Sequence, residues 1–210
     1  MSPRPYRLGR RQAAKQETRG RILAAARQML TAKSGSSRFT IDAVAEAANV
    51  ARMTVYYQFK NKRELLEALY GDIAARGELK HLDEAFANPD PLAALLDFIG
   101  IFIRFWSSDR LLIRRVHALA ALDPEIREGL HSHEARRKRD LQHILTRVKE
   151  QYGHPTARKL PEAVDILHML TSFEAFDDLS GATRKAYEVG DTVMRLALAA
   201  VVLYGAPLGE

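Results

Sequence analysis

The side chains between residues 51 and 62 combine the groups that proteins use to contact nucleic acid. Arg52 carries a guanidinium suited to guanine, and Lys62 carries a charge suited to phosphate oxygens. Tyr56 and Tyr57 add hydroxyls for the DNA backbone and rings that suit thymine methyl groups, and Thr54 adds a hydroxyl for a base edge. These residue types within one short segment predict contact with nucleic acid.

The positive charge of the chain is concentrated at its N-terminal end. Among 210 residues, 32 are Lys or Arg and 26 are Asp or Glu, so the formal net charge is +6. The first 70 residues hold 14 of the basic and 5 of the acidic residues, a balance of +9, and the remainder has a balance of −3. This asymmetry indicates a polyanionic partner, either nucleic acid or, as the alternative, a membrane surface.

Composition excludes several classes of protein. Apolar residues make up 47% of the chain, which is typical of a packed globular protein. Because there is no cysteine, the chain cannot form disulfides, a thiol nucleophile or a Cys-ligated zinc site. No apolar stretch follows the basic N-terminus, and the longest charge-free stretch, 196–209, is shorter than the roughly 20 residues of a membrane span. We therefore expect a cytoplasmic protein.

The sequence has no recognisable catalytic or metal-binding pattern. It has no Gly-rich phosphate loop and no G-x-S-x-G motif. His131 and His133 are two residues apart, and on a helix such residues do not face each other as zinc ligands four residues apart do. We predict no catalytic residues, no cofactor and no metal site, and a protein that is not an enzyme.

Helical patterns extend over the whole chain and predict an all-α protein. Residues 1–16 are basic with almost no apolar side chains, which predicts a flexible arm. Apolar residues then recur with helical spacing over 17–33, 41–48, 52–58 and 61–77. Beyond residue 77 the periodicity remains helical throughout, and no strand pattern is present.

Caps and a turn separate the two shortest of these helices. Thr40 and Asn61 offer N-cap oxygens to the helices that follow them. Asn49 tolerates the left-handed conformation, so 49–51 predicts a tight turn. Two short helices joined by such a turn form a helix-turn-helix, whose second helix fits the major groove of DNA.

The segment from Phe39 to Leu66 resembles the DNA-binding segment of the TetR family of bacterial repressors. The matching positions are Phe39, Thr40, Ala45, Ala48, Val50, Thr54, Tyr56, Phe59, Lys62 and Leu65. The segment departs from the family at three positions, where Gly, Ser and a small residue are usual: Asn49, Ala51 and Met53.

The resemblance also implies a domain organisation. It covers about 17–77, because Thr18 to Ala26 resembles the family's first helix. We expect the basic flexible arm (1–16), a three-helix DNA-binding domain (17–77, helix-turn-helix about 40–59) and a larger helical bundle for effector binding and dimerisation (78–210).

Chemistry and resemblance together assign eight residues to DNA: Thr40, Ala51, Arg52, Met53, Thr54, Tyr56, Tyr57 and Lys62. Arg52 is the candidate for guanine readout, Thr54 and Met53 are further candidates for base edges, and Thr40 and Lys62 for phosphates. The basic arm would follow phosphates or enter the minor groove. For Phe59 we favour a position in the core, and Tyr56 has a core position as its alternative.

The helix predicted over 92–107 is apolar nearly all round, so we place it in the centre of a domain. The resemblance implies that this region encloses a pocket for a small apolar or aromatic effector, with candidate lining residues Phe98, Phe102, Phe105, Trp106, His117, Met169 and Phe173. The alternative is that these side chains are ordinary core. We interpret His168 as a core histidine, with a pocket residue as the alternative, and the basic run 136–139 as a solvated helix face.

The last two predicted helices, 161–179 and 183–204, carry small and apolar residues suited to close packing. The resemblance implies that they pair with the same helices of a second chain, so that the homodimer binds a palindromic operator and is released as a repressor by its ligand. Two alternatives remain: an activator of the same fold, and a helical module that binds a protein or membrane through its basic end.

Overall fold

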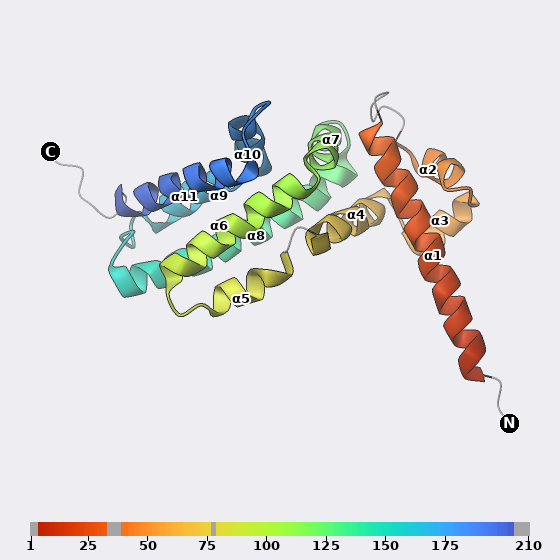
Figure 1. The fold of residues 1–210 in the computed structure, drawn as a ribbon, viewed down its shortest axis with the longest axis horizontal. Coiled ribbons are helices and arrows are strands. Elements are labelled where there is room, and N and C mark those ends of the chain that lie inside the picture. Colours follow the sequence, from red (N-terminus) through yellow and green to blue (C-terminus); the bar gives the residue numbers. More distant parts are fainter. Residues whose placement is uncertain (1–3, 33–38, 77–78, 204–210) are drawn as a thin grey trace. The chain divides into compact units, whose positions relative to one another are not determined.

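The computed structural model describes residues 4–32, 39–76 and 79–203 (Figure 1). Within these ranges all regular secondary structure is helical, so the predicted all-α class is confirmed. The elements are α1 (Arg4–Thr31), α2 (Ile41–Ala47), α3 (Arg52–Gln58), α4 (Lys62–Arg76), a 3-10 helix η1 (Leu79–His81), α5 (Leu82–Ala87), α6 (Pro91–Ser108), α7 (Arg110–Ala120), α8 (Pro124–Tyr152), α9 (Leu160–Leu170), α10 (Phe173–Ser180) and α11 (Ala186–Leu203).

The chain divides into two compact units. The first contains the described residues up to Gly71 together with Arg114–Gly129, and the second contains the remaining described residues. We expected one boundary, at residue 77. The difference arises because the corner between α7 and α8 belongs to the first unit, where Asp123 pairs with Lys62 of α4.

The first unit is a helix-turn-helix packed on a long first helix. α1 packs against α2, and α2 against α3. Apolar side chains at helical spacing form its core, among them Ile22, Ala26, Leu30, Val44, Val55, Phe59, Leu65 and Leu69. Burial of these side chains is the main favourable contribution to folding of this unit.

The prediction of a flexible arm is wrong for residues 4–16, because α1 is continuous from Arg4 to Thr31. Most residues of this segment have high helix propensity, and extending an existing helix costs far less than starting one. Gln58 contacts the neighbouring turns of α1. Its side-chain Nε2 donates to the Lys15 backbone carbonyl at 3.3 Å, and its backbone carbonyl accepts from Arg19 Nη1 at 3.1 Å. Residues 1–3 lie outside the described part.

The predicted caps and turn of the first unit are confirmed. Thr40 Oγ1 accepts from the Ala43 N–H at 3.2 Å, and Asn61 Oδ1 accepts from the Glu64 N–H at 2.8 Å. Asn49 has a φ of 51°, the left-handed conformation that the tight turn between α2 and α3 requires. These local contacts fix where α2 and α4 begin and how the chain enters α3.

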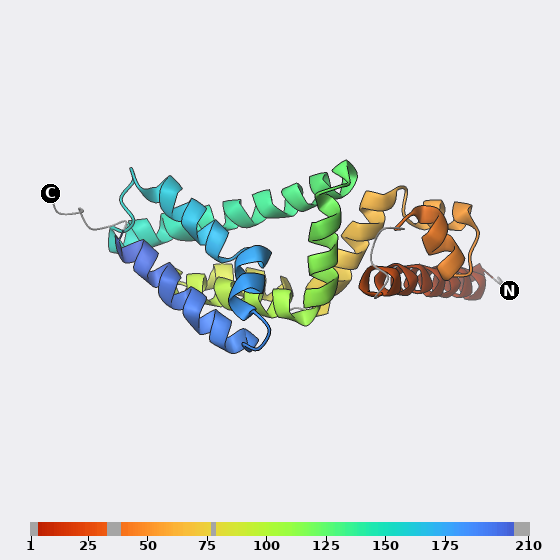
Figure 2. The ribbon, with the colours of Figure 1, turned by 90° about the horizontal axis from the view of Figure 1, so that it is seen from above.

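The second unit is a helical bundle built around α6. This helix packs against α5, α10 and α11 (Figures 1 and 2). Among the described residues, α6 is the helix whose length and apolarity would suffice to cross a membrane, and 61% of it is buried inside the protein. This agrees with the central position predicted for 92–107.

The predicted helix 161–179 is two helices, α9 and α10. α9 ends at Leu170, and Thr171 Oγ1 donates back to the Leu167 carbonyl at 2.8 Å. Ser172 then caps α10, because its Oγ accepts from the Ala175 N–H at 3.1 Å. Serine and threonine hydroxyls compete for backbone groups in this way, which ends the helix despite its continuous apolar pattern.

Candidate functional site

The outer face of α3 carries an unusual set of exposed side chains. Tyr57 is 82% exposed and Met53 57% exposed, and Arg52 is exposed beside them. Val55 and Phe59 point the other way and are fully buried in the first unit. Two large exposed side chains on one short helix form a surface that can contact base edges in the major groove.

Arg52 is oriented by its neighbours but remains accessible. Its Nε lies 3.0 Å from Asp42 Oδ1, and both side chains are 60% exposed. Its Nη2 donates to the Tyr56 hydroxyl at 3.3 Å, and its guanidinium carbon lies 5.6 Å from the centre of the Tyr56 ring. Exposed pairs of this kind contribute about 0–1 kcal/mol, so DNA can replace Asp42 at low cost.

The remaining predicted DNA residues fall into two groups. Ala51, Thr40 and Tyr57 are exposed, whereas Thr54 and Tyr56 are half-buried at the rim of α3. All of these residues belong to the first unit, on α3 or at the starts of α2 and α3.

Lys62 differs from a free surface cation. Its Nζ lies 2.6 Å from Asp123 Oδ2, its side chain is 21% exposed, and Nζ lies 5.5 Å from the centre of the Phe39 ring. Burial raises the pKa of Asp123, but the hydrogen bond and charge of Lys62 outweigh burial and lower it. A phosphate contact from Lys62 therefore requires that phosphate replace Asp123.

Ala51 occupies the N-cap position of α3 and gives it no side-chain cap, although its φ of −66° and ψ of 144° suit a capping residue. We expect Ala51→Ser to stabilise the first unit by about 0.5–2 kcal/mol, because the hydroxyl can accept a free N–H of the first turn. Urea unfolding followed by far-UV circular dichroism measures the gain. Ala47→Ser, at an exposed position of α2, is the control, and an equal effect of both would contradict the capping argument.

The structure brings together five of the seven candidate effector residues, Phe98, Phe102, Phe105, Trp106 and Phe173, which we call the aromatic cluster. All five are buried, and their ring centres are 4.6–6.3 Å apart between neighbours. Met169 is instead 59% exposed on α9, and His117 belongs to the first unit rather than the second. The aromatic cluster is therefore the part of the predicted lining that forms one group.

A polar cluster lies beside the aromatic cluster: Arg137 and Thr171 are buried, and Glu134 and His168 are half-buried. Arg137 is 2% exposed, so the prediction that 136–139 is a solvated face is wrong at this position. Its Nη1 donates to the His168 carbonyl at 3.0 Å and to Thr171 Oγ1 at 2.9 Å, and its Nη2 donates to Glu134. His168 Nε2 lies 3.1 Å from Glu134 Oε2.

Sequence reasoning missed Arg137, although a signal was present. Arg137 continues the buried apolar stripe of α8, because it precedes Leu141, Ile144 and Val148 at helical spacing. Because its neighbours in the sequence are charged, we did not assign Arg137 to this buried stripe. Trp106 connects the aromatic cluster to the polar cluster, because its Nε1 donates to the Thr171 backbone carbonyl at 3.0 Å.

The ion pair of Glu134 makes the stability of the second unit depend on pH. Burial raises the pKa of Glu134, but hydrogen bonds and charge from His168 and Arg137 outweigh it and lower the pKa from 4.5 to about 2. Because the folded-state pKa is lowered, this stabilisation is complete above pH 4.5 and is lost as the pH falls towards about 2.

We therefore expect Glu134→Gln to lose less of its free energy of unfolding than the wild type when the pH falls from 4.5 towards about 2. Urea unfolding followed by the fluorescence of Trp106, the single tryptophan, measures it. Glu150→Gln, an exposed position on the same helix, should keep the pH dependence of the wild type. Parallel losses in wild type and Glu134→Gln would contradict the role of this pair.

Comparison with known proteins agrees with this architecture. Residues 22–69 match the family described as "Bacterial regulatory proteins, tetR family". The HTH-type transcriptional regulator TtgR of Pseudomonas putida is 36% identical over 81 residues, a match that spans 38% of this chain and 38% of the relative.

Solved structures extend the likeness over most of the chain. NalD of Pseudomonas aeruginosa has a TM-score of 0.69 at 19% identity and covers 90% of this chain and 97% of its own. A TetR transcription regulator from Haloarcula marismortui has a TM-score of 0.65 at 13% identity, and the match covers 90% of this chain and 98% of that regulator. At these identities the likeness shows a shared fold.

A capped helix-turn-helix followed by a separate helical unit defines the class of helix-turn-helix regulators. Within this class, the helix-turn-helix segment 22–69 is similar to that of the TetR family of bacterial regulatory proteins.

Proposed function

We propose that the protein is a dimeric, sequence-specific DNA-binding repressor that acts in the cytoplasm and is released from a palindromic operator by a small apolar or aromatic ligand. The observation that carries this proposal is the outer face of α3, where Arg52, Met53 and Tyr57 are exposed on a helix-turn-helix whose other side is fully buried. NalD, which shares the fold, is described as the secondary repressor of a multidrug efflux pump, and this supports repression rather than activation.

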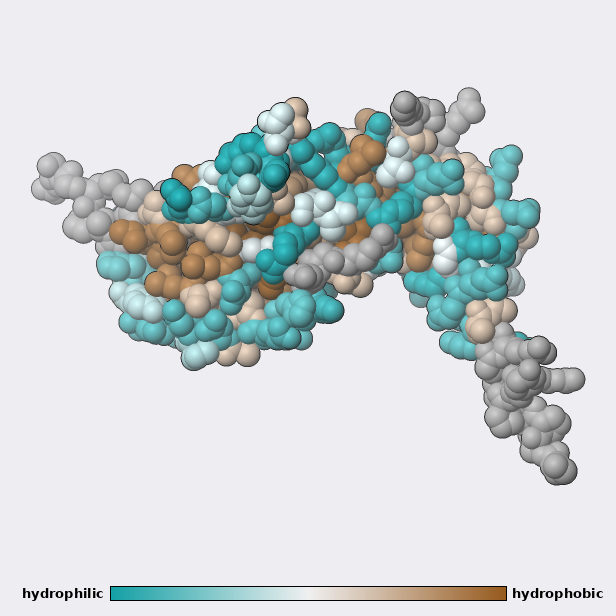
Figure 3. Space-filling view, in the orientation of Figure 1, coloured by the Kyte–Doolittle hydropathy of each residue, from teal (hydrophilic) through white to brown (hydrophobic). Residues whose placement is uncertain are grey.

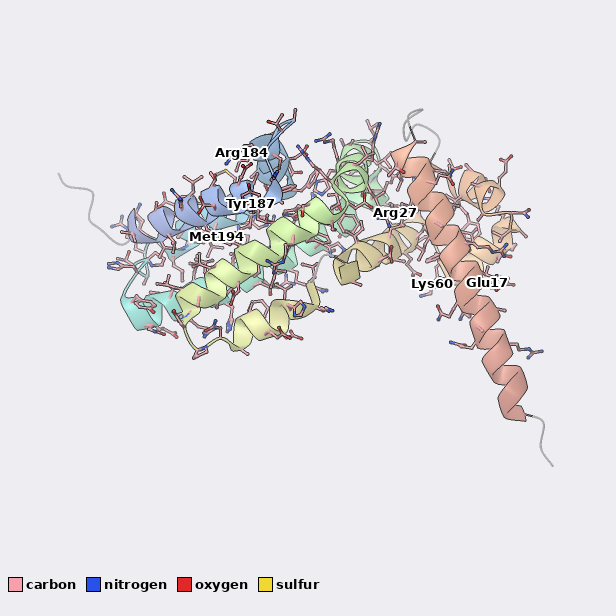
Figure 4. All side chains as sticks on the ribbon, viewed as in Figure 1. Glu17, Arg27, Lys60, Arg184, Tyr187 and Met194 are labelled. Atoms are coloured by element: carbon pink, nitrogen blue, oxygen red, sulfur yellow. The ribbon has the colours of Figure 1, made fainter. Side chains whose placement is uncertain are left out.

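Apolar surface on the second unit supports dimerisation. Met169 of α9 and Tyr187, Leu196 and Val202 of α11 are 45–69% exposed. Figure 3 shows hydrophobic residues over α11 and the adjoining part of α6, and Figure 4 shows Tyr187 and Met194 along α11. Two-fold pairing of such a surface would present two α3 helices to half-sites about 34–36 Å apart, or a multiple of that distance.

We expect the double variant Leu196→Glu, Val202→Glu to be a monomer, because a charge on each side of the proposed interface would be buried without a partner. Sedimentation velocity measures the change from dimer to monomer. Leu122→Glu is the control, because Leu122 is 85% exposed in the first unit and lies outside the proposed interface. A wild-type monomer, or a double variant that remains dimeric, would contradict this interface.

DNA binding itself is tested by titrating labelled duplexes with the purified protein at increasing salt. Each phosphate contact should add about 0.9 to the slope of log affinity against log salt, so binding should weaken steeply. Replacing Tyr56 and Tyr57 by alanine should abolish specific binding. Loss of binding to liposomes or to a protein partner, with DNA binding unchanged, would instead support the interaction module.

A further inference from the structure

Arg137 is a buried cation whose hydrogen-bonding capacity is not fully used. Its Nη1 and Nη2 atoms have the partners described above, whereas its Nε is buried and donates no hydrogen bond within the described part of the chain. Leaving a charged donor buried without an acceptor is costly, so native structures rarely keep one without a reason.

The unused donor lies on the edge of the guanidinium that suits a carboxylate. Nε and Nη2 form two parallel N–H donors, and a carboxylate accepts both at once. Glu134 accepts from Nη2 alone, and its Oε2 is shared with His168. This edge of Arg137 is therefore half occupied.

The surroundings of this edge favour an apolar body attached to the anion. The guanidinium carbon lies 5.7 Å from the centre of the Phe102 ring and 6.0 Å from that of Trp106, and both rings belong to the aromatic cluster. A cationic ligand in this place would meet the like charge of Arg137 in a region of low dielectric constant.

We infer that Arg137 anchors the effector, and that the effector is the anion of an apolar or aromatic carboxylic acid. The ligand carboxylate accepts from Nε and Nη2, and its apolar body packs against Phe102 and Trp106. Glu134 occupies Nη2 in the absence of ligand and leaves when the acid binds. Its side chain is 29% exposed, so it can turn towards solvent, and one carboxylate replaces another beside the buried cation.

This inference rests on the proposed function, in that the second unit is taken as the effector-binding unit. The alternative is that Arg137 only ties α8 to the C-terminal end of α9 through the His168 carbonyl. A structural tie gives no preference between an acid and its neutral amide, and this difference separates the two roles.

The test uses the full-length protein and matched probes: 2-naphthoate with 2-naphthamide, and decanoate with decanamide. Calorimetry and the fluorescence of Trp106 measure their binding. We expect at least one acid to bind the wild type about 10- to 100-fold more tightly than its amide, as a charge-assisted pair of hydrogen bonds implies. Glu134→Gln should increase affinity for the acid, because it removes the competing carboxylate.

Arg137→Met should remove the preference for the acid while binding of the amide persists. Arg137→Lys, which keeps the charge but lacks the two parallel donors, should reduce the preference. Arg136→Met, an exposed neighbour with the same change of charge, should leave it intact. If Arg137→Met does not fold, Glu134→Gln and Arg137→Lys still decide the question.

The inference is overturned if the wild type binds no acid more tightly than its amide, or if folded Arg137→Met keeps the preference. DNA binding of the ligand-free protein is measured in parallel. Specific DNA binding without any acid preference rejects this inference and leaves the proposed function standing. Acid preference that depends on Arg137, in a protein that binds no DNA, rejects the proposed function and leaves the anion site standing.

Discussion

Arg52→Ala is expected to lower affinity for the operator by about 1–3 kcal/mol, or 5- to 150-fold, and to relax the choice of base at one position of each half-site. The reason is that Arg52 is exposed at the start of α3, where its two N–H donors can reach a guanine edge. Competitive titration of the operator against single-base variants measures both effects.

The control for charge is Arg158→Ala, which removes an exposed arginine from the second unit. Both variants lose one positive charge, but only Arg52→Ala should alter the preference among bases. Equal and uniform weakening by the two substitutions would show that Arg52 does not read a base.

Phe59→Ala is expected to destabilise the first unit by about 3–5 kcal/mol, because it empties a large site in the core. Phe59 is 1% exposed, and the Arg19 guanidinium carbon lies 4.3 Å from the centre of its ring, so a cation–π contact is lost as well. DNA binding should be lost with the fold of this unit.

Two probes separate this effect from global unfolding. Far-UV circular dichroism reports on all helices, whereas Trp106 fluorescence reports on the second unit. Phe59→Ala should lower the urea midpoint of the circular dichroism transition more than the midpoint of the fluorescence transition. Tyr57→Ala, on the exposed face, should change stability by no more than about 0.5 kcal/mol. Equal stabilities of Phe59→Ala and Tyr57→Ala would contradict the assignment of the core.

Where local residues decide the structure, the sequence was sufficient. Thr40, Asn49 and Asn61 act on backbone groups a few residues away, so their cap and turn roles were predictable, as was the burial of Phe59. The central position of α6 followed from its composition alone. These features fix the helix-turn-helix and the exposed face of α3.

Contacts between distant residues were not predictable in this way. Lys62 and Asp123 are 61 positions apart, and no pattern in either segment predicts their pairing. The same reason explains His117, which the family resemblance suggested as a pocket residue beside the aromatic cluster but which belongs to the other unit. Arg137 was missed because a run of charged residues suggested solvent, although its spacing from Leu141 indicated the core.

The long first helix is a different case. Composition indicated that residues 4–16 lack apolar side chains to bury, which is correct for the exposed residues 11–16. The segment is nevertheless helical, because it extends a helix that is already anchored by Ile22 and Leu30 in the core of the first unit.

In the proposed function, a dimer of this protein reads a specific palindromic DNA sequence through α3. Selection of bound fragments from random genomic DNA, at a salt concentration that suppresses non-specific binding, tests it most directly. We expect a small set of fragments that share an inverted repeat, with half-sites one helical turn or a multiple of it apart, and that are lost with Arg52→Ala. Uniform recovery of fragments without a common sequence would contradict it.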